Sequence, residues 1–199
     1  MNNVEYAKKA AAVDVDGLIL VCSGAGGHTG MLNSFAFVSE VRRFWDGPLM
    51  VAGGIGNGRD IRAVEAMGAD YGYMGTSFIA TTESLAEPEY KAMTVECSAT
   101  DLVPSRAFTG VLASWMRPSI LAKGLDPDEV AKQAGKINFT GHAGSETKAW
   151  NGVWSAGQGV GNITSVRPAA DLIAQLKSEY DEAVQSESKR LEKQRAALV

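Results

Sequence analysis

The feature that most constrains the fold of this chain is a repeated unit, a short apolar run that leads into a glycine-containing loop. The runs are DGLILVCS, PLMVAGG and DYGYMGT, at residues 16–23, 48–54 and 70–76. A continuous apolar run of this length is typical of a strand that is covered on both faces. Single helical patterns separate the runs, which predicts right-handed crossovers and a parallel sheet. The predicted fold class is therefore α/β.

Amphipathic helices are expected between these strands, after an Ala-rich, helix-prone segment at residues 4–13. Ser34 is expected to cap the helix between the first two strands, and Asp60 the helix between the second and third strands. Gly68 stands where this later helix should end. The apolar stripe of the first helix comprises Phe35, Val38, Val41 and Phe44, and that of the second comprises Ile61, Val64 and Met67.

The rest of the chain predicts two further parts. Residues 85–150 have Pro, Gly and irregular spacing, so we expect a small helical or irregular subdomain there. Residues 151–199 are expected to return to the first part and to end in a long helix. Leu172, Leu176 and Tyr180 stand at four-residue spacing in that helix, and its charged last turns should protrude.

Composition excludes several classes of partner. The formal net charge of -4 gives no general attraction to nucleic acid or to anionic membranes. Two cysteines, Cys22 and Cys97, stand far apart and without metal-ligand spacing, so neither a metal site nor a disulfide framework is expected. No run approaches the roughly 18 apolar residues of a membrane helix. The cytoplasm is the simplest expected compartment.

Two of the loops have the composition of a phosphate site. Gly53 and Gly54 end the second strand, and Gly75 and Thr76 end the third. Glycine lets backbone N–H groups approach an anion closely, and the ends of neighbouring parallel strands meet at one edge of a sheet. The alternative is that these glycines serve only the backbone geometry of tight turns. Neither a P-loop nor a Rossmann GxGxxG pattern is present.

His28 lies in the loop after the first strand, within GAGGHTG at residues 24–30, and is one of only two histidines. A neutral imidazole can accept an acidic C–H proton at neutral pH or hydrogen-bond an oxygen of a substrate. The alternative is an ordinary surface histidine.

Three blocks in this order resemble the nitronate monooxygenase family: GAGGHTG, the stretch VAGGIGNG…MGTSF at residues 51–78, and WSAGQGVG at residues 154–161. The resemblance implies an FMN-dependent (β/α)8 barrel that oxidises nitronates or nitroalkanes with molecular oxygen. Residues 1–84 would form the C-terminal half of that barrel, and residues 151–199 would add a loop that closes over the cofactor.

The resemblance also implies roles for individual residues. His28 would be the catalytic residue that activates or polarises the substrate. The residues implied to bind FMN are Gly27, Gly53, Gly54, Gly75, Thr76 and Gln158.

Two departures from the family pattern leave alternatives open. Gly24 stands where better-characterised members often have Glu, so the substrate is open, and FMN-dependent enoyl-acyl carrier protein reductases share much of the scaffold. A complete barrel takes about 250 residues. We therefore expect only its last strands, in a fragment of a longer enzyme or in a half that forms homo-oligomers or pairs with a missing N-terminal half. A non-catalytic remnant is the remaining alternative.

Other candidate residues are expected to be structural. Cys22 is interpreted as a small buried thiol. His142 is expected to face solvent, with a lid over the substrate as the alternative. Trp115, Trp150 and Trp154 are expected to pack rather than to stack on nucleic-acid bases.

Overall fold

The computed structural model describes residues 1–135 and 152–197. Its first sheet is parallel and contains β1 (Leu18–Val21), β3 (Leu49–Ala52) and β4 (Tyr71–Tyr73), in the order β1-β3-β4. Leu18 pairs with Leu49, and Met50 pairs with Tyr71. The predicted α/β class and the parallel pairing are both confirmed. The described residues form no closed barrel.

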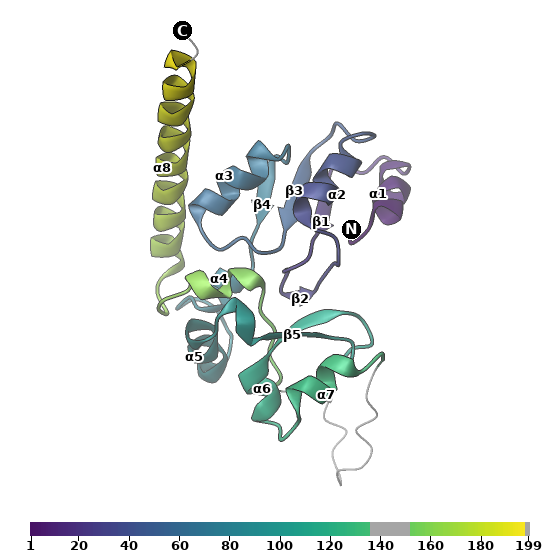
Figure 1. Cartoon of the computed structure of the whole chain (residues 1–199). Coiled ribbons are helices and arrows are strands. Elements are labelled where there is room, and N and C mark those ends of the chain that lie inside the picture. Colours follow the sequence, from purple (N-terminus) through teal and green to yellow (C-terminus); the bar gives the residue numbers. More distant parts are fainter. Residues whose placement is uncertain (136–151, 198–199) are drawn as a thin grey trace.

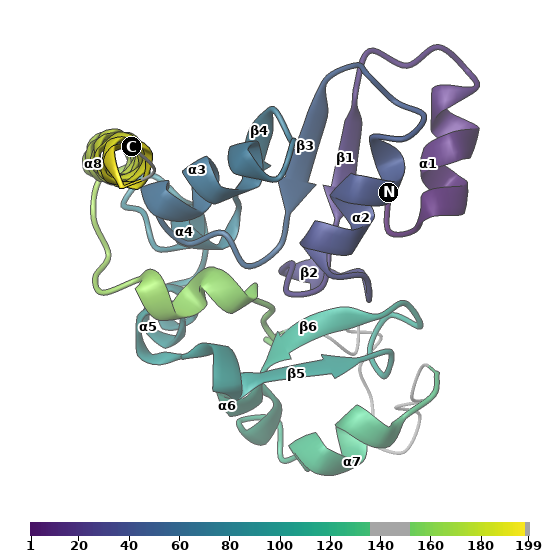
Figure 2. The same cartoon turned by 45° about the horizontal axis from the view of Figure 1, so that its top comes forward.

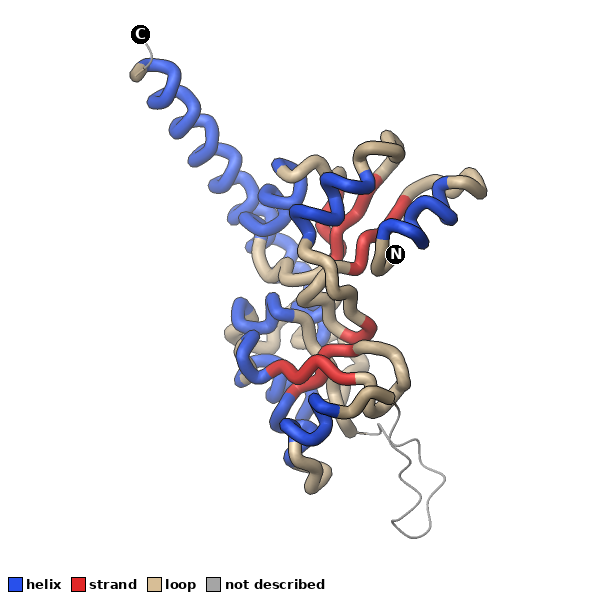
Figure 3. The backbone as a smooth tube through the Cα atoms, turned by 45° about the vertical axis from the view of Figure 1, so that its right-hand side comes forward, coloured by secondary structure: helices blue, strands red, loops and turns tan. Residues whose placement is uncertain are grey.

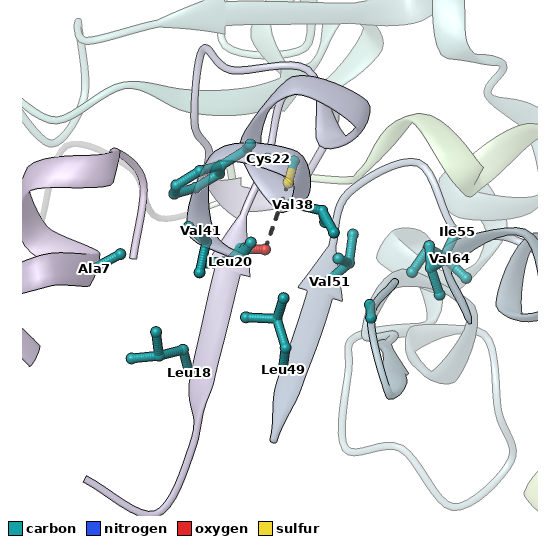
Figure 4. Packing of buried hydrophobic residues seen from close by; sticks show 12 residues of the cluster. Ala7, Leu18, Leu20, Cys22, Val38, Val41, Leu49, Val51, Ile55 and Val64 are labelled. Atoms are coloured by element: carbon teal, nitrogen blue, oxygen red, sulfur yellow. Dashed lines mark hydrogen bonds between the residues drawn. The ribbon is translucent and has the colours of Figure 1, made fainter. Parts of the chain in front are cut away.

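Three helices cover one face of this sheet: α1 (Val4–Ala11), α2 (Ser34–Val41) and α3 (Gly58–Ala66). Figure 2 shows α1 and α2 beside β1, and α3 beside β4. Alternate strand residues point into the core between sheet and helices, as Figure 4 shows. The fully buried members of this core are Ala7, Leu18, Leu20, Cys22, Phe37, Val38, Val41, Leu49 and Val51.

The opposite face of the sheet is open, so the expectation that both faces are covered is wrong for the described residues. Ile19, Met50 and Tyr71 share one row of this face because they pair across the three strands. Ile19 is 36% exposed, and Tyr71 and Tyr73 are 57% and 54% exposed. A run of apolar residues does not reveal whether a second layer is present to cover it.

Both predicted helix caps are wrong, the first by one residue and the second by three. Asn33 caps α2, since its side chain accepts a hydrogen bond from Phe35 N at 2.9 Å. Asn57 caps α3 by accepting from Asp60 N at 2.9 Å, while the Asp60 carboxylate accepts from Gly56 N. Asparagine is as good an N-cap as serine or aspartate, so residue type alone did not decide between the neighbours.

The predicted apolar stripe of α2 is wrong at Phe35, whereas that of α3 is confirmed. Phe35 is 70% exposed, because α2 turns Phe37 toward the core in its place. Val64 is buried, and Ile61 and Met67 pack against the same core as predicted. Gly68 has a φ of +105° at the end of α3, as its predicted position at the helix break requires.

The segment after the parallel sheet contains strands as well as helices. β5 (Leu102–Ser105) and β6 (Ala113–Met116) pair in antiparallel fashion, and β2 (Gly27–His28) adds to β6. Figure 3 shows these strands in a separate half of the molecule from the parallel sheet. The expected helical or irregular subdomain is therefore corrected to one with a small sheet. Its short helices are α4 (Thr76–Ile79), α5 (Pro88–Glu96), η1 (Ala99–Asp101), α6 (Arg117–Leu121) and α7 (Pro127–Lys132).

The last part of the chain runs back to the parallel sheet through η2 (Gln158–Asn162) and ends in α8 (Ala169–Ala196). Figure 1 shows α8 lying along α3 and then extending beyond the rest of the fold. Leu172 and Leu176 are buried, and Tyr180 donates a hydrogen bond to Glu65 at 2.7 Å. The long terminal helix is confirmed. No helix among the described residues is long and apolar enough to cross a membrane.

Candidate functional site

A cleft of about 430 Å³ opens at the carboxyl ends of the three parallel strands. Loops that follow β1, β3 and β4 form one side of it, and Tyr90 with the segment from Ser155 to Gly159 forms the other. Apolar side chains line its walls, namely Val21, Ile55, Met74 and Ile79. In open α/β sheets, ligands bind beyond the carboxyl ends of the strands, which is where this cleft lies.

The glycines of the cleft leave room for a ligand. Gly27 and Gly54 adopt φ values of +66° and +74°, which favour glycine. A Cβ atom placed on Gly27, Gly54 or Gly75 would meet no atom within 4 Å. Gly53 differs, because a Cβ there would lie 2.9 Å from the carbonyl oxygen of Ser23. Gly53 thus serves the packing of the two loops, and the other three border open space.

Backbone hydrogen bonds join the loops that come from distant parts of the sequence. The carbonyl oxygen of Gly24 accepts from Gly54 N at 3.2 Å and from Gln158 N at 2.8 Å. The hydroxyl of Thr76 accepts from Gly157 N at 2.9 Å. The cleft is therefore held by contacts between all of its loops.

His28 lies on the rim of the cleft, where β2 pairs with β6. Its partner in the antiparallel ladder is Ala113, and the next residue, Thr29, donates from its backbone N to Leu112 O at 3.0 Å. The imidazole is exposed. Sequence reasoning placed His28 in a loop and missed the small sheet that fixes its backbone.

The structure brings together most of the predicted site residues. Those that border this one cleft are Gly27, His28, Gly53, Gly54, Gly75 and Thr76. Gln158 does not border it. A Cβ on Gly24 would lie 2.6 Å from Gln158 Oε1, so this side chain packs against the back of the His28 loop instead. His142 and Trp150 lie outside the described residues.

Two aromatic residues of the site were not predicted. Tyr90 lines the cleft, donates a hydrogen bond to Ser155 O at 2.6 Å and stacks on Trp154 with ring centroids 5.2 Å apart. Burial raises the pKa of Tyr90 above its ordinary value. Tyr73 lines the cleft from the end of β4. Tyr90 lies outside every motif of the sequence, and Tyr73 lies in the third strand run without having been singled out, so the folded arrangement reveals both.

Charge in the cleft is sparse. Among the residues that line it, none is Asp, Glu, Lys or Arg, and His28 is the single histidine. The described residues contain no cluster of potential metal ligands. Burial raises the pKa of Cys22 to about 11, so this core thiol stays protonated at neutral pH and packs as predicted.

The fold and the cleft define a mixed α/β protein with a candidate ligand site at the carboxyl edge of a parallel sheet. The profile of the nitronate monooxygenase family matches residues 1–179, and the chain belongs to this family. It is 31% identical over 200 residues to a nitronate monooxygenase of Paraburkholderia phytofirmans, an alignment that covers 92% of this chain and 54% of the relative. The chain thus spans about half the length of this relative.

Two solved structures have a similar fold. FabK from Thermotoga maritima is 26% identical with a TM-score of 0.74, and the match covers 96% of this chain and 62% of that one. A nitroalkane oxidase from Streptomyces ansochromogenes is 25% identical with a TM-score of 0.72, covering 94% and 57%. The family is therefore one of oxidoreductases.

Proposed function

We propose that this chain carries the FMN site and the catalytic histidine of an oxidoreductase that oxidises alkyl nitronates with molecular oxygen. One observation carries the proposal: His28 and both glycine loops, which come from three separate strand ends, border a single cleft. The family membership and the nitroalkane oxidase fold support the substrate class.

The residues of the cleft fit FMN. A phosphate group fits the open space beside Gly54 and Gly75. Its donors would be the backbone N–H of Gly75 and the Thr76 hydroxyl, because Gly54 N already donates to the Gly24 carbonyl oxygen. No cationic side chain lines the cleft, so these dipoles would stabilise the phosphate charge. The apolar walls suit a flat aromatic ring system. FMN, when bound, supplies the electron-accepting chemistry.

His28 orients and deprotonates the substrate in this proposal. Its neutral imidazole accepts a proton from the acidic carbon of a nitroalkane, or its N–H donates to an oxygen of the nitro or nitronate group. No other side chain lining the cleft is a histidine, a carboxylate or a lysine, the residue types that most often act as general bases. The pairing of β2 with β6 limits the movement of the histidine backbone and so helps to orient the ring.

We further propose that the parallel sheet is the last part of a (β/α)8 barrel. Ile19, Tyr71 and Tyr73 sit on its open face, which is the face that points inward in a barrel. Strands that complete the barrel would cover this face and pair with the free edges. They would come from a longer chain, from a second copy or from a separate N-terminal half.

The test combines cofactor binding with turnover. Purified protein is titrated with FMN, monitored by quenching of flavin fluorescence, and oxygen uptake is measured with propyl-2-nitronate and with 2-nitropropane. We expect saturable FMN binding, and His28→Ala should retain the bound-flavin spectrum. With 2-nitropropane, whose acidic C–H needs a base, the variant should lose at least 100-fold in turnover, the lower range for a general base. Propyl-2-nitronate has no such proton to remove, so the loss with this substrate reports the hydrogen bond from His28 to a nitronate oxygen. Gln133→Ala, at an exposed position that does not line the cleft, is the control and should retain activity. Retained activity in His28→Ala, or a protein that does not bind FMN, would contradict the proposal.

A second candidate function comes from the likeness to FabK. An enoyl reductase-like enzyme would oxidise NADH or NADPH in the presence of an enoyl thioester. Crotonyl-coenzyme A is a suitable probe in the same preparation. Cofactor oxidation that depends on this thioester, without oxygen uptake on the nitronate, would favour this candidate over the first.

A further inference from the structure

A second hollow, here called the outer groove, lies between α3 and α8 and shares no lining residue with the cleft. It encloses about 380 Å³. Its apolar lining comes from Ala63, Ala66 and Met67 at the end of α3 and from Ala183 on α8. This volume lies within the range of about 300–1,000 Å³ that small-molecule sites occupy.

Three arginines border the outer groove, and two of them have no ionic partner among the described residues. Arg62 is held in place, because its Nε donates to Glu187 at 2.8 Å and its Nη1 donates to Glu65 at 3.0 Å. Arg59 and Arg190 are exposed. The lining thus presents three guanidinium groups and one carboxylate, on a chain whose formal net charge is -4.

Phe35 gives the outer groove an aromatic side. It is the second residue of α2, is 70% exposed and lines the groove rather than the core. An exposed aromatic ring next to unpaired guanidinium groups contributes nothing to the core of the described fold. It does suit a ligand that has an apolar body and an anionic head.

We propose that the outer groove binds a small organic anion, a phosphate or carboxylate joined to an aromatic group. The guanidinium fork matches the oxygens of both anions, and Arg59 and Arg190 are free to turn toward one. The ring of the ligand would lie against Phe35 and Met67. This site is separate from the cleft and does not depend on the function proposed for the cleft.

Phenyl phosphate is the first probe, and its binding to the full chain is measured by ligand-observed saturation-transfer NMR. We expect saturable binding that the double variant Arg59→Gln/Arg190→Gln weakens at least tenfold. The control Lys189→Gln/Lys193→Gln removes two positive charges from exposed positions of α8 outside the groove, and it should change the affinity less than twofold. Far-UV circular dichroism checks that each variant is folded.

Three more measurements fix the site and the ligand class. Phe35→Ala should lower the affinity for phenyl phosphate at least threefold but leave the affinity for inorganic phosphate unchanged. Thr76→Val should leave binding intact, because Thr76 belongs to the cleft. Benzoate in place of phenyl phosphate tells whether a carboxylate head suffices. The proposal is overturned if the wild-type protein shows no saturable binding, if both double variants lose affinity equally, or if Thr76→Val abolishes binding.

Discussion

At the scale of single residues, the glycines of the cleft divide into those that the fold needs and those that leave room for a ligand. Gly53 has a φ of +127°, and a Cβ there would press on the Ser23 carbonyl. Gly75 has a φ of -130° and open space around the position of a Cβ. An alanine therefore fits the backbone at Gly75, and its methyl group would point into the open space of the cleft.

Gly75→Ala is predicted to leave the free energy of unfolding within about 0.5 kcal/mol of the wild type, as for a surface substitution. It should nevertheless weaken FMN binding at least tenfold, because its methyl group takes the space proposed for the phosphate. Urea unfolding and fluorescence titration measure the two effects. Gly135→Ala, which also meets no atom within 4 Å but lies outside the cleft, should change neither. Unchanged FMN affinity in Gly75→Ala would place the phosphate elsewhere.

The sequence identified the site residues that belong to a motif. His28 and the two glycine loops were predictable because strand ends of a parallel sheet meet at one edge, whatever the exact packing. Tyr90 was not predictable, since it enters the cleft through a hydrogen bond to Ser155, 65 residues away in the sequence. The sequence also could not predict that the Gln158 side chain points toward Gly24 and away from the cleft, because this contact depends on tertiary packing.

At the scale of elements, Asp70 links the end of α2 to two strands of the parallel sheet. Its carboxylate accepts from Leu49 N at 2.8 Å, at the start of β3, and from Arg42 Nη2 at 2.7 Å. Arg42 follows α2 and also donates to the carbonyl oxygens of Gly68 and Gly47. The hydrogen bond from Leu49, and secondly that from Arg42, lower the pKa of Asp70.

A pKa that is lower in the folded state means that the ionised Asp70 stabilises the fold above about pH 4, its ordinary value, and that this stability is lost as the pH falls through the folded-state pKa. Asp70→Asn should lower the free energy of unfolding by about 1 kcal/mol at pH 7, since the carboxylate is partly exposed. The difference should shrink toward pH 2. Urea unfolding at both pH values measures this difference in the free energy of unfolding. Asp46 is exposed and has no ion pair among the described residues, so Asp46→Asn is the control. An equal difference at both values would contradict the assignment.

The strands of the parallel sheet were predictable from the sequence, whereas β5 and β6 were not. β5 contains Pro104, which lacks a backbone N–H. A proline in an apolar run therefore favours the prediction of an edge strand or a loop. β6 is buried at all four positions and so shows no alternation. Neighbours from near and far in the sequence bury it: the Phe108 ring meets Trp115 at a centroid distance of 4.8 Å, and the carbonyl oxygen of Trp154 accepts from Met116 N at 2.8 Å.

At the scale of the whole molecule, the cleft exists because segments far apart in the sequence meet behind it. The loop from Gly24 to Gly26 follows β1, Thr76 begins α4, and Ala156 and Gly157 precede η2. Gly26 sits where all three approach. The sequence predicted each loop but not this meeting point, because close approach of two backbones has no local pattern.

Gly26→Ala is the substitution that tests this meeting point. Its Cβ would lie 2.6 Å from Gly157 N and 2.9 Å from both the Ala156 carbonyl carbon and Thr76 Oγ1. The loops must separate, which should lower the free energy of unfolding by about 1–3 kcal/mol and weaken the bond from Gly157 N to Thr76. Urea unfolding measures the loss, and Gly161→Ala, whose nearest neighbour is 4.0 Å away, should be close to neutral. If Gly26→Ala is as stable as that control, the segments behind the cleft are not packed as the fold requires.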